Sequence, residues 1–72
     1  MKKIKTGDLV YIPSEVTLYQ KKNKNAISAH VKVEKPINVL VTEVKTSSFE
    51  IYYQNEYWLV DKNNTYQVKE EL

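Results

Sequence analysis

Aromatic rings and lysine amines are the side chains of this 72-residue chain whose chemistry best suits ligand binding. The chain contains six tyrosines, one tryptophan and one phenylalanine, and five of its eleven lysines lie between residues 21 and 35. Rings stack on planar groups while lysine amines attract anions. We expect the ligand-binding set to be Tyr11, Tyr19, Lys21, Lys22, Lys24, His30, Lys32, Tyr52 and Trp58. A competing interpretation assigns the tyrosines to a thin core and a subunit contact, and the lysines to solubility alone.

Catalytic groups are scarce in the sequence. Nucleophilic catalysis needs a base beside the nucleophile, yet the chain has no cysteine and one histidine, His30. Neither Ser14 nor Ser28 lies in the glycine-flanked turn that exposes a serine nucleophile. A single glycine does not make a phosphate-binding loop, and one histidine without thiolates does not make a metal site. We therefore expect a protein that is not an enzyme, with no cofactor and no metal.

Charge is distributed unevenly along the chain, although the net charge is only +2. Residues 1–35 carry a net charge of +5, residues 36–72 carry −3, and arginine is absent. Planar, bidentate recognition of phosphate or guanine relies on arginine, so sequence-specific nucleic-acid binding is disfavoured and weak binding stays as an alternative. Because no apolar run has the length of a signal peptide or membrane helix, we expect a cytoplasmic protein.

Short strands must position these side chains. β-branched and aromatic runs predict strands at residues 8–12, 37–44, 49–54, 57–60 and 65–68, with a helical turn over 61–64. In the turn at 54–56, Asn55 is best able to adopt a left-handed conformation. The side chains expected in the core are Val10, Val39, Val41, Phe49, Ile51 and Leu59.

Residues 13–36 are longer than an ordinary connection. Segments 15–20 and 26–33 have some β character, which predicts a hairpin-like excursion with its tip at 21–25. The order of these elements is that of an SH3-like barrel, with an OB-fold as the main competitor. We expect one all-β domain over residues 1–72, a small SH3-like five-stranded antiparallel barrel with a long loop after the first strand. Oligomerisation would add buried surface to so small a domain, so we also expect a homo-oligomer.

Several of these segments resemble small uncharacterised early or accessory proteins of T-even-type tailed phages: residues 7–13 (GDLVYIP), 18–19, 36–41 (PINVLV), 57–60 (YWLV) and 66–68. The resemblance covers most of the chain and carries no known functional residues with it; Asn55 departs from it, at a turn where glycine is usual. It implies a dispensable protein that acts in the host cytoplasm, on the host or its defences.

Three hypotheses follow for the activity. The first is sequestration of a small anionic, nucleotide-like signalling ligand by a non-enzymatic accessory protein. The second is inhibition of a host protein, through a barrel groove or an exposed strand edge. The third is weak nucleic-acid binding by a small barrel, which predicts a steep dependence on salt.

Overall fold

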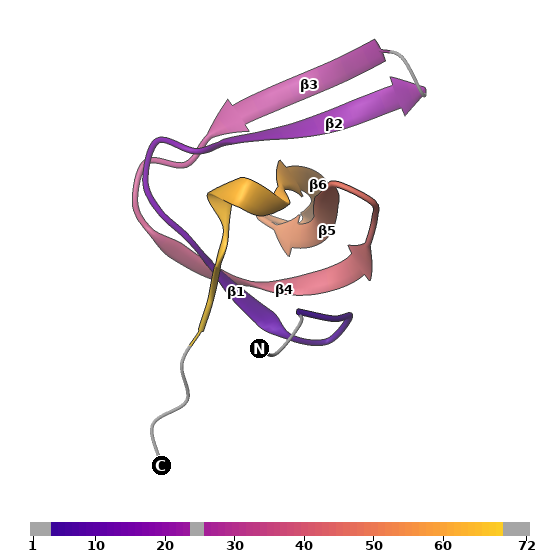
Figure 1. Ribbon diagram of the computed structural model, residues 1–72. Helices are drawn as coiled ribbons and strands as arrows, with labels where there is room; N and C mark the ends of the chain where they lie inside the picture. Colours follow the sequence, from indigo (N-terminus) through magenta and orange to yellow (C-terminus); the bar gives the residue numbers. More distant parts are fainter. Residues whose placement is uncertain (1–3, 24–25, 69–72) are drawn as a thin grey trace.

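The computed structural model describes residues 4–23 and 26–68 (Figure 1). These residues form a single antiparallel sheet and one short 3₁₀ helix. The elements are β1 (Leu9–Ile12), β2 (Thr17–Asn23), β3 (Ala26–Lys32), β4 (Ile37–Val44), β5 (Ser48–Tyr53), β6 (Glu56–Asp61), η1 (Lys62–Asn64) and β7 (Tyr66–Gln67). In the described residues, no helix is long and apolar enough to cross a membrane.

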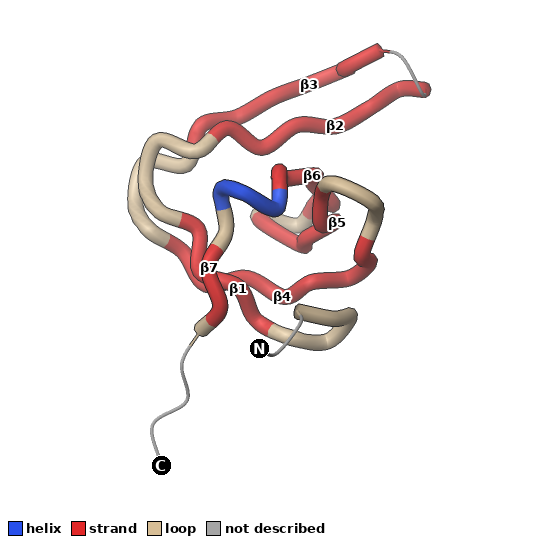
Figure 2. The backbone as a smooth tube through the Cα atoms, in the orientation of Figure 1, coloured by secondary structure: helices blue, strands red, loops and turns tan. Residues whose placement is uncertain are grey.

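The sheet has seven strands in the order β3-β2-β6-β5-β4-β1-β7. Strand β4 is shared between two ladders, since its first half pairs with β1 and its second half with β5. Figure 2 shows how the sheet curls around its interior. No ladder joins β3 to β7 within the described part of the chain, so the sheet is open.

The meander β4–β5–β6 confirms three of the predicted strands almost to the residue. A tight turn joins β5 to β6 at Gln54 and Asn55, whose φ angles are +51° and +66°. Two successive positive φ angles match the right-handed twist of a hairpin. The left-handed conformation predicted for Asn55 is confirmed. Gln54 also adopts the left-handed conformation, although glutamine does not favour it.

The excursion between β1 and β4 is a two-stranded hairpin, β2–β3, which projects from the rest of the sheet (Figure 1). This hairpin raises the strand number from the expected five to seven. The register shifts twice along it, with Ser28 and Lys22 as the extra residues. Bulges of this kind bend a strand and disrupt its ladder locally.

The core forms where alternate side chains of the strands point inward. Val10, Val39, Val41, Phe49 and Ile51 are buried, as predicted from the sequence. The prediction is wrong for Leu59, which is only partly buried because Trp58 and Val60 take the inward positions of β6. The remaining buried apolar side chains are Ile12, Leu18 and Val33.

Candidate functional site

The candidate site lies at the seam where β2 separates from β6. The two strands share one residue pair, Tyr19 with Leu59. Beyond it the Gln20 side chain bridges the strands, since its Nε2 donates to the backbone carbonyl of Tyr57 at 2.9 Å and to Glu56 Oε1 at 3.1 Å. One side chain therefore takes the place of a backbone ladder, and a groove opens beside it.

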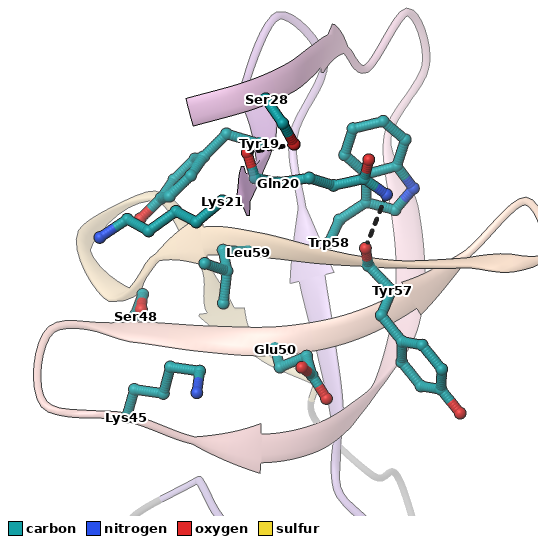
Figure 3. A pocket seen from close by; sticks show the side chains of 10 residues that line it. All are labelled: Tyr19, Gln20, Lys21, Ser28, Lys45, Ser48, Glu50, Tyr57, Trp58 and Leu59. Atoms are coloured by element: carbon teal, nitrogen blue, oxygen red, sulfur yellow. Dashed lines mark hydrogen bonds between the residues drawn. The ribbon is translucent and has the colours of Figure 1, made fainter. Parts of the chain in front are cut away.

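This seam groove has a volume of about 630 Å³ and is open to solvent. That size is typical of small-molecule sites, which range over roughly 300–1,000 Å³. In Figure 3, Leu59 lies in the middle of the groove, between Tyr19 and Lys21 of the hairpin and Lys45 and Glu50 of the meander. Its lining residues are Tyr19, Gln20, Lys21, Ser28, Lys45, Ser48, Glu50, Tyr57, Trp58 and Leu59.

The charged groups of the seam groove differ in how they are paired. Lys45 Nζ lies 3.0 Å from Glu43 Oε2, and this carboxylate raises the pKa of Lys45. Glu50 Oε1 accepts a hydrogen bond from Thr42 Oγ1 at 2.8 Å. Lys21 forms no ion pair or hydrogen bond with another described residue. Its amine is therefore the cation of this groove that is available to an anion.

Tyr19 separates the seam groove from a second one, which we call the histidine groove. The second groove has a volume of about 440 Å³ and is lined by Glu15, Val16, Thr17, Tyr19, Ile27, His30, Asp61 and Asn64. The Tyr19 hydroxyl donates to Asp61 Oδ1 at 3.2 Å. Burial, followed by the charge of Asp61, raises the pKa of Tyr19 above its ordinary value of 10.0. The ring is therefore a neutral wall between the two grooves at physiological pH.

Four of the predicted ligand-binding residues line the two grooves. Tyr19, Lys21 and Trp58 line the seam groove, and His30 lines the histidine groove together with Tyr19. Trp58 is 8% exposed, and its indole N–H donates to the carbonyl of Tyr53 at 3.1 Å. Trp58 therefore supports the floor of the groove and exposes only a small surface to a ligand.

The other predicted residues lie elsewhere. Tyr52 contacts the seam groove only through Tyr57, whose ring it meets edge-on at 5.3 Å. Tyr11 lies on β1 at the opposite end of the sheet, with its ring centroid 6.3 Å from that of Tyr66. Lys22 and Lys32 are exposed and line neither groove, and Lys24 lies outside the described residues.

Sequence reasoning did not select Tyr57, Leu59 or Lys45, although all three line the seam groove. Strand alternation was the signal that identifies two of them. Once Trp58 and Val60 point inward, Tyr57 and Leu59 must point outward. No sequence pattern identifies Lys45, because it follows β4 in a polar turn. Only the tertiary fold brings it to the groove.

The grooves offer stacking surfaces, hydrogen-bonding side chains and the Lys21 amine, which has no partner among the described residues. Among the described residues, no group of three histidine, cysteine or acidic side chains is placed to hold a metal ion. Such an arrangement can bind a small planar or anionic molecule. Comparison with protein families, with curated proteins and with solved structures detects no protein similar to this chain.

Proposed function

We propose that this chain is a non-enzymatic binding protein built on an SH3-like barrel. The proposed barrel strands are β7-β1-β4-β5-β6, which are neighbours in that order. The hairpin β2–β3 corresponds to the long loop after the first strand, and η1 to the helical turn before the last strand. Both are the connections expected of an SH3-like barrel at those places in the chain.

Its proposed ligand is a small anion that carries a planar ring, such as a nucleotide, held in the seam groove. The observation that carries this proposal is that Lys21, whose amine has no ion-pair partner among the described residues, lines the same groove as Tyr19 and Tyr57. Aromatic rings bind a base by stacking, at roughly 1–3 kcal/mol per base. The amine supplies the counter-charge for a phosphate.

Sequestration of such a ligand is the biological role we propose, as an accessory protein of a tailed phage that counters host signalling or defence. This role follows from the resemblance to small phage proteins that we infer from the sequence of segments 7–13, 36–41 and 57–60. A sequestering protein removes one ligand for each site that it fills, so this role needs no catalytic group.

Calorimetry against linear and cyclic nucleotides tests the proposal, with Trp58 fluorescence as a second readout because the chain has one tryptophan. We expect saturable binding that weakens at least fivefold in Lys21→Ala. Lys22→Ala is the matched control, since Lys22 is the adjacent lysine and lines neither groove. An absence of heat at high micromolar concentrations of every nucleotide would refute the ligand class.

A second candidate function, protein interaction, is favoured by a row of exposed apolar side chains across the outer face of the sheet. Leu9 pairs with Leu40, and Tyr52 pairs with Tyr57. The Val41–Ile51 pair sets Leu40 beside Tyr52 at the next position of that ladder. The four side chains are between 44% and 57% exposed. Contiguous apolar surface of this kind often marks a protein-binding site.

A pull-down from host lysate distinguishes the two candidates. If this apolar row binds a host protein, one stoichiometric partner is recovered with the native chain and with Lys21→Ala, but not with Leu40→Lys. Leu40 is 45% exposed, so a lysine there leaves the fold intact. Recovery of the same partner by Leu40→Lys contradicts this second function.

A further inference from the structure

Among the described residues, strand β3 presents a weakly protected edge. It is the last strand of the sheet, and Figure 1 shows it on the far side of β2 from the other strands. Its sequence from residue 26 to residue 31, AISAHV, contains no lysine, arginine, aspartate or glutamate and no proline. Edge strands normally carry charges, prolines or bulges that prevent another chain from pairing. Here the protection is limited to the bulge at Ser28 and to Lys32 at the strand end.

The backbone of His30 points outward from this edge. Val33 directs both of its backbone groups toward the β2 side, since its N–H donates to Val16 O at 2.9 Å and its carbonyl accepts from Glu15 N at 2.7 Å. Alternate residues of an antiparallel strand direct these groups to opposite sides. The backbone N–H and C=O groups of Val31 and Ala29 therefore point toward β2. Those of His30 and Lys32 point away from the sheet.

We propose that β3 pairs with β3 of a second copy of this chain, antiparallel about a two-fold axis beside His30. This register sets His30 against its own counterpart and Lys32 against Ser28, so the two copies of Lys32 do not meet across the pair. It also sets Ala29 against Val31, two partly buried side chains that pack at the margin of the core. The strand is thus complementary to itself.

The pairing changes the binding surface. Ile27 is 61% exposed and lines the histidine groove together with His30, close to the proposed axis. Pairing places the corresponding groove of the second copy directly alongside, so that two open grooves become one longer site. The dimer does not depend on the ligand proposed for the seam groove, so each proposal is tested separately.

Disulfide cross-linking tests the register, because the chain has no cysteine of its own. Residues directly opposite in a hydrogen-bonded antiparallel pair have Cα atoms about 5.5 Å apart, within the range a disulfide spans. We expect oxidation of His30→Cys to give a covalent dimer. Thr46→Cys, exposed in the β4–β5 turn, is the control and is expected to give no covalent dimer.

Sedimentation velocity tests the backbone pairing. We expect the native chain and His30→Ala to sediment as dimers. We expect His30→Pro, which lacks the imidazole as His30→Ala does but also lacks the outward N–H, to sediment as a folded monomer. Proline is tolerated on an edge strand when its missing N–H faces away from the sheet. A native chain that is monomeric at several hundred micromolar overturns the proposal, as does a dimer that His30→Cys fails to cross-link.

Discussion

The hydroxyl of Tyr19, on the projecting hairpin, donates a hydrogen bond to Asp61, the last residue of β6, at 3.2 Å. Tyr19 also pairs through its backbone with Leu59 on the same strand. These two links, together with the Gln20 bridge, join the hairpin to the meander and determine the position of the wall between the two grooves. Weakening these contacts therefore alters the candidate site as well as the stability of the fold.

Removing the Tyr19 hydroxyl tests the first link. We expect Tyr19→Phe to lower the free energy of unfolding at pH 7 by about 0.5–1 kcal/mol, the typical net value of one hydrogen bond. Urea unfolding followed by Trp58 fluorescence measures the change. Tyr66→Phe, at an exposed tyrosine on β7, is the control and is expected to stay within the error of the native chain.

The same variant has a distinct alkaline signature. The pKa of Tyr19 is raised in the folded state, so its protonated form stabilises the fold below the unfolded value of 10.0. That contribution is lost as the pH rises from 10 through the folded pKa. We expect the stability difference between the native chain and Tyr19→Phe to be constant from pH 7 to 9 and to shrink above pH 10. A constant difference up to pH 11 would contradict the raised pKa of Tyr19.

The Gln20 bridge is tested by charge. In Gln20→Glu the amide donors are replaced by a carboxylate that faces the Tyr57 carbonyl and the Glu56 side chain. We expect a loss of about 1–2 kcal/mol in unfolding free energy at pH 7, most of it recovered near pH 4 as the introduced carboxyl protonates. Gln20→Ala is the control, with a smaller loss that does not vary with pH.

The β5–β6 turn can be stabilised. Gln54 has φ +51°, and a left-handed conformation costs an ordinary side chain roughly 1–2 kcal/mol. Asparagine tolerates this conformation better, so we expect Gln54→Asn to raise the unfolding free energy by about 0.5 kcal/mol. Gln54→Val, with a β-branched side chain, is expected to lower it by about 1 kcal/mol or more. Thermal melts of both variants check the prediction, and an equal effect of the two would refute it.

Trp58 closes the core beneath the seam groove. Trp58→Phe leaves the Tyr53 carbonyl without its indole donor and leaves a void in the core. We expect it to cost about 2–3 kcal/mol, within the range for large core side chains. Because the tryptophan itself is removed, circular dichroism is the appropriate probe. The neighbouring Tyr57→Phe alters an exposed side chain and is expected to be almost neutral.

Local pattern was sufficient for most of the strands. The run 37–44 is β4 to the residue, and the helical turn expected at 61–64 contains η1. These elements depend on side-chain alternation and turn residues, which act over a few positions. Leu59 was wrongly placed in the core because the run 57–60 is apolar on both faces, so periodicity alone did not identify the inward side chains.

The candidate site was predictable only in part, because it depends on where the hairpin lies. Tyr19 and Lys21 face Lys45 and Leu59 only after β2 has paired with β6 over one residue and then separated from it. Long-range placement of this kind leaves no local signature. Tyr11 was wrongly expected near the site for the same reason. It precedes the hairpin in the chain but lies at the other end of the sheet.

Strand order also determines how this protein can be handled. The first and last strands, β1 and β7, are hydrogen-bonded neighbours, whereas β3 lies at the far end of the sheet. An affinity tag or a tether to a sensor surface that is introduced next to β1 or β7 is therefore attached at the end of the sheet opposite β3. Immobilisation there leaves the grooves and the β3 edge accessible, so ligand binding and self-association can be measured on the same tethered molecule.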